Sequence, residues 1–303
     1  MDEALECVEA SFVAQGTGHA VNRSRERIIL PHVSLHYMAG ALPDLKTLGM
    51  KIYTVAPAGL QFLVLLFDTE SGKLLSFMQA DHLGRIRTGA ASGIATKYLA
   101  RPAASRLGLI GTGRQARTQL EAIAKVRKLS RVKVFGRDAN RLKNFCREMA
   151  EQLNLAVEPA SSAEEATRFG EIVTTATSAQ RPVVHGAWLQ PGTHLNAIGA
   201  NMPDRRELDD EAVARAELIA VDSAEQSRQE SSDLIQALSS LGRGWDGVIE
   251  LHALVTGQHP GRSAAEQITL FKSHGITLWD VAVATHVYQR AIREGKGKNL
   301  EIG

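Results

Sequence analysis

An apolar strand that runs into a glycine-rich loop and then a helix is the feature that most constrains the fold. Residues 107–110 read LGLI, and GTGRQA follows directly over residues 111–116. From residue 106 onward, strand-like and helix-like segments alternate, which predicts a parallel sheet with helices on both faces. The predicted strands are 107–110, 132–135, 172–175, 194–198 and 218–221, and the predicted helices are 114–128, 138–152, 162–168 and 207–215.

The first hundred residues follow a different pattern. Residues 2–15 have the apolar spacing of an amphipathic helix. Residues 50–67 are rich in β-branched and aromatic residues, and the polar segment 68–73 separates them from the apolar residues 74–78, as in a β-hairpin. We therefore expect an antiparallel sheet with a helix here, and an amphipathic helix over 278–294 that can return to this first part.

Composition excludes several classes of protein. The chain has 303 residues, enough for about two domains. Its net charge of +2 predicts no nucleic-acid partner, and its apolar runs, all far shorter than the roughly 18 residues of a membrane helix, predict no membrane span. The two cysteines, Cys7 and Cys146, form no close-spaced motif. The acidic start MDEALECVEA does not resemble a secretory signal, so we expect a cytoplasmic protein.

The loop after the first strand of the alternating region has the pattern G-x-G-x-x-A. Gly111 permits a tight turn, Gly113 allows the backbone to approach a pyrophosphate, and Ala116 allows the helix to pack closely on the strand. The helix N-terminus then offers free N–H groups to phosphates. A dinucleotide site is the prediction, and a glycine turn without a ligand is the alternative.

The end of the second predicted strand bears on the choice of cofactor. An acid would stand there to bind the ribose of NAD, but this chain has Gly136 followed by Arg137. Arginine suits a 2′-phosphate, which favours NADP(H), with NAD(H) possible. Arg137 could instead be a solvated surface residue. The predicted cofactor-binding residues are Gly111, Thr112, Gly113, Arg114, Gln115, Ala116, Gly136, Arg137, Thr175, Ala176 and Thr177.

Several further segments, in one order along the chain, resemble the ornithine cyclodeaminase/mu-crystallin family almost from end to end. Those segments are GMKIYT around Lys51, 86–101, GTGRQA, 172–183, 191–201, 206–211 and 269–280. The resemblance implies a Rossmann-type doubly wound parallel sheet domain, 104–277, inserted into a smaller α+β substrate-binding and dimerisation domain, 1–103 plus 278–303. It also implies a homodimer formed largely through the sheet of the smaller domain. Family members usually carry another strand and part of a helix before the segment that opens this chain.

The family pattern points to basic residues that would bind a substrate. By their place in it, Arg25, Lys51 and Arg87 resemble the family's substrate-binding cations, and Met38 and Thr88 beside them would line the pocket. An amino or imino acid always carries a carboxylate, which arginine holds in bidentate geometry, whereas lysine supplies a compact charge and a proton. Each of the three could also be a solvated surface charge.

One position departs from the family's cyclodeaminases. Asn201 stands where those enzymes carry an aspartate that is the candidate acid/base group. An amide cannot take up a proton at neutral pH, which argues against cyclodeamination. Asp204 stands three residues further on, and Glu207 is expected in the first turn of the following helix. His32 and His36 lie in a segment of extended character, and we expect no metal site.

We therefore expect an NAD(P)H-dependent oxidoreductase that reduces the C=N bond of a small cyclic or linear imino acid, similar to ketimine and pyrroline-2-carboxylate reductases. Lys51 and Arg87 would be its catalytic residues, and Asn201 would contact the substrate. Three alternatives stay open: an NAD-dependent ornithine cyclodeaminase that forms proline and ammonia, an amino-acid dehydrogenase, and a protein that binds NADPH and a small ligand without turnover, as mu-crystallin does.

Overall fold

The computed structural model describes residues 1–202 and 204–299. The chain forms two compact units. The first comprises Met1–Leu5 and Thr88–Gly275, and the second comprises Glu6–Arg87 and Ile276–Gly303. The first unit thus interrupts the second along the sequence. The division into functional domains at 103/104 and 277/278 stays a prediction.

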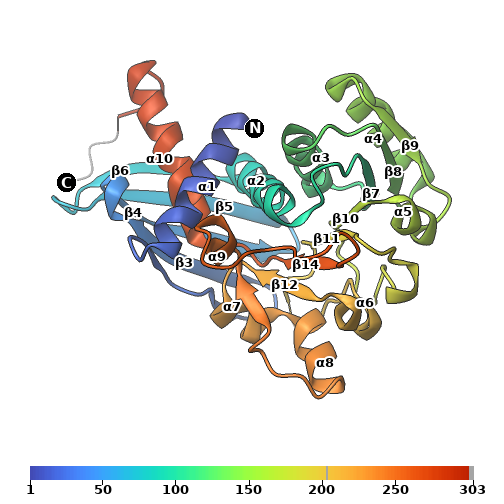
Figure 1. Cartoon of the computed structure of the whole chain (residues 1–303). Helices are drawn as coiled ribbons and strands as arrows, with labels where there is room; N and C mark the ends of the chain where they lie inside the picture. Colours follow the sequence, from blue (N-terminus) through green and yellow to red (C-terminus); the bar gives the residue numbers. More distant parts are fainter. Residues whose placement is uncertain (203, 300–303) are drawn as a thin grey trace. The chain divides into compact units, whose positions relative to one another are not determined.

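The first unit contains an eight-stranded sheet in which every neighbouring pair is parallel (Figure 1). Its strand order is β13-β12-β14-β11-β10-β7-β8-β9, which confirms the predicted doubly wound Rossmann-type sheet. The strands are β7 (Arg106–Ile110), β8 (Arg131–Phe135), β9 (Ala156–Pro159), β10 (Ile172–Thr175), β11 (His194–Ala197), β12 (Leu218–Val221), β13 (Val248–Glu250) and β14 (Thr269–Lys272).

Helices cover both faces of this sheet, as the alternating pattern predicts. Apolar residues of α3 and α4 pack with β7 and β8 in one buried cluster, and those of α5, α6 and α8 pack with β10, β11 and β12 in another. The helices of this unit are α3 (Arg114–Val126), α4 (Ala139–Leu153), α5 (Ala163–Phe169), α6 (Asp210–Arg215), α7 (Ala224–Glu230), α8 (Ser232–Ser240) and α9 (Leu251–Val255), with short 3-10 helix η2 (Gly186–Trp188). Helix α2 (Asp81–Leu99) continues from the second unit into the first.

Parts of this unit differ from the sequence-based expectation. Strands β9, β13 and β14 were not predicted, and β14 lies inside the sheet, between β11 and β12. The helix predicted over 207–215 begins only at Asp210, because the Asp209 side chain accepts a hydrogen bond from the backbone N–H of Ala212 and caps the helix. Glu207 therefore precedes the helix, and its expected place in the first turn is wrong.

The second unit is built on an antiparallel sheet of order β1-β3-β4-β5-β6, with β2 paired to β3. The predicted hairpin is confirmed as β5 and β6, joined by the polar turn 69–73. The strands are β1 (Val21–Asn22), β2 (Glu26–Ile29), β3 (Ser34–Leu42), β4 (Thr47–Ala56), β5 (Gly59–Asp68) and β6 (Leu74–Gln79), with short 3-10 helix η1 (Pro43–Leu45) after β3.

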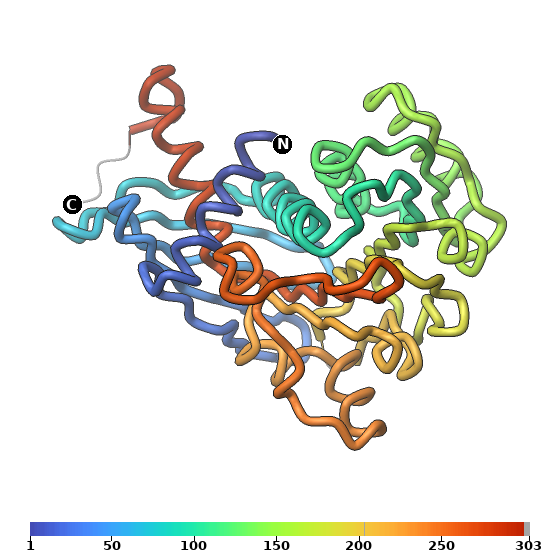
Figure 2. Tube along the Cα trace, in the orientation of Figure 1, coloured from blue at the N-terminus to red at the C-terminus, as the bar shows by residue number. Residues whose placement is uncertain are grey.

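One face of this sheet is covered by the C-terminal helix α10 (Thr277–Arg293), which contacts β3, β4 and β5. Figure 2 shows this red helix beside the blue and cyan strands. Gly49 lets the helix approach closely, because a Cβ at this position would lie 3.0 Å from Cγ2 of Val281. From residue 6 onward, helix α1 (Asp2–Gly16) belongs to the same unit, where Phe12 meets Trp279 of α10 edge-on at 5.4 Å. Among the described residues, no helix combines the length and apolar character needed to cross a membrane.

Candidate active site

Strand β4 directs Lys51 toward the face of the sheet that α10 covers. Residues 47, 49, 51 and 53 of this strand are buried, and the residues between them are less so, because successive side chains of a strand point to opposite faces. Met38 stands opposite Lys51 in the β3–β4 register and is 1% exposed. The side chains of Lys51 and Met38 therefore share one buried environment.

Lys51 and Arg87 converge on one carboxylate. Lys51 Nζ lies 2.9 Å from Asp280 Oδ1, and Arg87 Nε donates to the same oxygen at 3.0 Å. Lys51 and Arg87 are 4% and 5% exposed, and Asp280 is fully buried. The Arg87 guanidinium also lies 5.4 Å from the ring centre of Trp279. The structure thus brings the two predicted catalytic residues together, through an aspartate from the opposite end of the chain.

Asp280 was not among the predicted site residues. Asp280 lies in the first turn of α10, where the helix dipole favours an acid. An acid at such a position needs no catalytic role to account for it. The available signal was its setting: Asp280 stands in the segment TLWDVAV, otherwise almost wholly apolar. A charge placed among residues that form a core needs a partner.

Positive charge exceeds negative charge in this cluster. Arg25, which is 5% exposed, is close enough for its charge to help lower the pKa of Lys51. Burial is the main reason that this pKa falls to about 8, Arg87 acts in the same direction, and Asp280 opposes both. Among the described residues, Arg87 Nη1 and Asp280 Oδ2 are buried without a hydrogen-bond partner. The arrangement suits an anionic ligand that also carries a nitrogen.

His36 is a buried neighbour of this site on β3, where its ring stacks on Tyr53. Burial and the charges of Arg27 and Arg25 lower the pKa of His36 to about 4. His36 is therefore neutral near pH 7 and cannot supply a proton there. Within residues 1–202 and 204–299, no group of three His, Cys, Asp or Glu is placed to hold a metal ion.

The glycine-rich loop of the first unit has the geometry of a phosphate-binding turn. Gly111 has φ of +119°, and a Cβ there would lie 2.5 Å from the carbonyl oxygen of Ala176, so glycine is required. Gly113 precedes α3, and a Cβ added to it would meet no atom within 4 Å. Ala116 is fully buried against the strand. The open approach at Gly113 and the N-terminus of α3 fit a dinucleotide pyrophosphate.

The end of β8 lies against the same loop. A Cβ at Gly136 would be 2.7 Å from Cγ2 of Thr112, so an acid at this position would force Thr112 to move. Arg137 follows and is exposed, whereas the side chain of Asp138 accepts from the backbone N–H of Arg141 and caps α4. Of the two residues after Gly136, Arg137 is thus the one free to meet a ligand.

The remaining predicted residues have different surroundings. Arg114 is exposed, and Gln115 and Asn201 are partly buried. Thr88 is buried and follows Arg87 in α2. Thr175 and Thr177, at the end of β10, both direct their hydroxyl groups to Glu207, at 2.9 and 2.7 Å. Glu207 is a second buried acid whose importance was missed, because the sequence pattern placed it in a helix.

Comparisons with known proteins show similarity over nearly the whole chain. The sequence model described as the ornithine cyclodeaminase/mu-crystallin family matches residues 1–295. A Delta(1)-pyrroline-2-carboxylate reductase of Bacillus cereus is 34% identical over 289 residues, which cover 93% of this chain and 86% of that protein.

Solved structures are similar over nearly the whole chain. A Delta(1)-pyrroline-2-carboxylate reductase of Thermococcus litoralis, in complex with NADH and L-proline, is 36% identical with a TM-score of 0.95, covering 99% of this chain and 96% of that one. An archaeal alanine dehydrogenase, described as a dimer with bound NAD, is 33% identical with a TM-score of 0.94, covering 100% of this chain and 95% of that one.

Proposed function

This chain belongs to the ornithine cyclodeaminase/mu-crystallin family, and we propose that it is an NAD(P)H-dependent reductase of a small cyclic or linear imino acid. The observation that carries the proposal is the buried cluster of Lys51, Arg87 and Asp280, which offers two cations, an unpaired N–H and an unpaired carboxylate oxygen. An imino acid presents the matching groups: a carboxylate and a C=N nitrogen that must be protonated before reduction.

Each residue has a chemical task in this reaction. Arg87, with Arg25, holds the substrate carboxylate through charge-assisted hydrogen bonds. Lys51 Nζ keeps a proton on the imine nitrogen, for which a pKa of about 8 is well suited near neutral pH. Asp280 binds both cations and orients them. The glycine-rich loop, with Gly111 and Gly113, would hold a nicotinamide dinucleotide, which when bound would be the source of hydride, and the protein supplies orientation and charge.

An amino-acid dehydrogenase is the second candidate, and the archaeal alanine dehydrogenase of similar fold favours it. Its reductive direction also passes through an imino acid, so the same cations would serve. A cyclodeaminase is less well supported, because Asn201 cannot act as the acid/base group. A protein that binds NADPH and a small ligand without turnover would need the same contacts but no proton donor.

The test is to follow absorbance at 340 nm with NADPH or NADH and cyclic imino acids such as pyrroline-2-carboxylate. Pyruvate with ammonia, and ornithine with NAD+, are assayed in parallel. The proposal requires consumption of reduced dinucleotide with a cyclic imino acid and no ammonia from ornithine. Turnover of pyruvate with ammonia alone would support the dehydrogenase, and ammonia from ornithine without net change of dinucleotide would support the cyclodeaminase.

We further propose that NADP(H) is preferred, because Arg137 is exposed beside the phosphate loop and Gly136 carries no acid. An Arg137→Ala variant is expected to bind NADPH about tenfold more weakly, since a charge-assisted hydrogen bond contributes about 1.5–3 kcal/mol. NADH affinity is expected to change by less than about twofold. Fluorescence titration of both dinucleotides measures this, and tighter binding of NADH than NADPH by the parent protein would refute the preference.

A homodimer is proposed through the face of the antiparallel sheet that α10 does not cover. Along β4 and its neighbours, the side chains on this face are largely apolar, and Leu48 and Phe77 are 39% and 51% exposed in the single chain. The apolar residues of this face include Leu35, Leu48, Ile52, Leu63, Leu65 and Phe77. A continuous apolar sheet face of this kind is typical of a subunit interface.

An Ile52→Glu variant is expected to be monomeric, because a charge in the middle of an apolar interface cannot be solvated when two copies meet. The mass in solution, measured by light scattering or sedimentation, should fall to half that of the parent. Ile292→Glu places the same charge on an exposed position of α10 and should leave the mass unchanged. A parent protein that is itself monomeric at micromolar concentration would contradict the proposal.

A further inference from the structure

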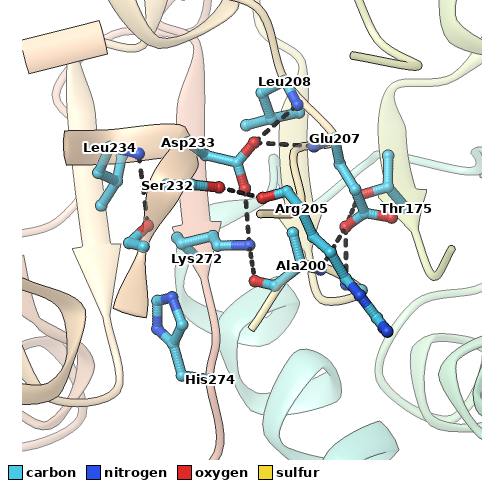
Figure 3. Close-up of polar contacts among 12 residues, drawn as sticks. Thr175, Ala200, Arg205, Glu207, Leu208, Ser232, Asp233, Leu234, Lys272 and His274 are labelled. Carbon is cyan, nitrogen blue, oxygen red and sulfur yellow. Dashed lines mark hydrogen bonds and ion pairs between the residues drawn. The ribbon is translucent and has the colours of Figure 1, made fainter. Parts of the chain in front are cut away.

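A network that includes three completely buried ionisable side chains lies at the carboxyl edge of the parallel sheet in the first unit. Glu207, Asp233 and Lys272 are each 0% exposed. Burying charges is unfavourable unless each is paired and hydrogen-bonded, so such groups mark places where backbone geometry depends on them. Figure 3 shows the three side chains between the ends of neighbouring strands.

Glu207 joins the segments that follow β10 and β11. Its carboxylate accepts from the backbone N–H groups of Thr177 at 2.8 Å and Gly199 at 2.6 Å, with a longer contact from Ala200 at 3.3 Å. The hydroxyl groups of Thr175 and Thr177 donate to it as well. A single carboxylate therefore fixes both segments to each other.

Lys272 and Asp233 close the network from the other side. Lys272, the last residue of β14, donates from Nζ to the carbonyl oxygen of Ala200 at 2.6 Å and forms an ion pair with Asp233 at 2.8 Å. Burial alone would raise the pKa of Asp233, but the charge and hydrogen bond of Lys272 lower it. Asp233 Oδ1 in turn accepts from the backbone N–H groups of Glu207 and Leu208, both at 2.9 Å.

The network lies beside the point where the sheet changes direction. Strands β7 and β10 are neighbours, and the chain proceeds from β7 toward β8 and from β10 toward β11. Ligands of such sheets bind in the crevice beyond the carboxyl ends at this switch point. The carbonyl oxygen of Ala176, between Thr175 and Thr177, lies against Gly111 of the phosphate loop.

This arrangement of loop and strand ends indicates where each half of a dinucleotide would lie. A dinucleotide whose pyrophosphate lay at the N-terminus of α3 and whose adenosine lay toward Gly136 and Arg137 at the end of β8 would extend its other half over the ends of β10 and β11. We propose that Glu207, Asp233 and Lys272 are positioning residues, which fix residues 175–177 and 199–201 as the seat of the nicotinamide ring. This inference rests on the proposed function only in that the protein binds a nicotinamide dinucleotide.

The test compares NADPH with 2′-phospho-ADP-ribose, which lacks the nicotinamide. In a Glu207→Gln variant, an amide NH2 replaces one acceptor oxygen and faces N–H donors, so the two segments are no longer held together. We expect NADPH binding to weaken at least tenfold and binding of 2′-phospho-ADP-ribose to change less than twofold. Lys272→Met should give the same result, because it releases the carbonyl oxygen of Ala200.

Glu171→Gln is the matched control. Glu171 also accepts from backbone N–H groups, those of Ser105 at 3.0 Å and Arg106 at 3.2 Å, but it lies just before β10, at the amino edge of the sheet. In Glu171→Gln, the ratio of the affinity for NADPH to the affinity for 2′-phospho-ADP-ribose should equal the ratio in the parent. A fraction of unfolded protein does not change this ratio, because it lowers the apparent affinity for both ligands by the same factor.

If Glu207→Gln does not fold, Thr175→Val removes a single hydroxyl donor to Glu207 at nearly constant volume and should shift the ratio about threefold in the same direction. An unchanged ratio in the folded variants would mean that the network only stabilises the fold, and the inference would be wrong. Failure of the parent protein to bind either ligand would refute the proposed function instead.

Discussion

A Lys51→Met variant is expected to lose about a thousandfold in kcat/KM for imine reduction while binding the reduced dinucleotide as the parent does. A positioned general acid contributes about 10²–10⁴-fold, and His36, with its pKa near 4, cannot replace Lys51. Methionine keeps the length of the side chain but has no proton to donate. Initial rates at 340 nm and a fluorescence titration measure the two quantities.

Lys46→Met is the control for this substitution. Lys46 belongs to the same unit but is exposed and pairs with Glu70 at the surface. The kcat/KM of the Lys46→Met variant should therefore stay within about twofold of the parent value. A Lys51→Met variant that keeps more than a tenth of the parent rate would show that the proton comes from elsewhere.

The pH dependence follows from the same residue. The proton donor must be charged, so kcat/KM should be level below the pKa of Lys51 and fall above about pH 8. Because Asp280 raises this pKa, Asp280→Asn should move the falling limb to lower pH. If the limb instead reflects titration of the substrate, it will lie at the same pH in both proteins.

An Arg87→Met variant is expected to lose about a hundredfold in kcat/KM for an imino acid, chiefly through a higher KM. This hundredfold loss corresponds to about 3 kcal/mol of binding free energy, at the upper end of the range for hydrogen bonds to a charged group. Asp280 keeps Lys51 as a partner in this variant, so the buried carboxylate is not left alone.

The decisive comparison uses a cyclic imine without a carboxylate, such as 1-pyrroline. With this substrate, Arg87→Met should differ from the parent by less than about threefold, because the group that Arg87 recognises is missing. Equal losses for the two substrates would show that Arg87 organises the site without binding the carboxylate.

Much of the first unit could be predicted because its signals are local. Strand, loop and helix follow one another from residue 107 to 126, and the two glycines carry their meaning in their spacing. Strand β14 was not predicted, because its four residues, TLFK, are too few to show an apolar periodicity. Their place in the sheet depends on pairing with β11 and β12.

The candidate site could be predicted only in part. Lys51 and Arg87 followed from family resemblance, but Asp280 did not, because its contacts span 229 and 193 residues. Glu207 was assigned to a helix because acids near a helix start are common, and its contacts with the ends of β10 and β11 exist only once the strands lie side by side.

By itself, the sequence determined the parallel architecture and the phosphate loop, because both depend on neighbours in the chain: apolar periodicity, glycine spacing and a helix start. Only the tertiary structure decided which charges are buried and which meet. Burial turned Lys51 from an ordinary lysine into one with a pKa of about 8, since both desolvation and the facing charges arise from residues that folding brings from distant parts of the chain.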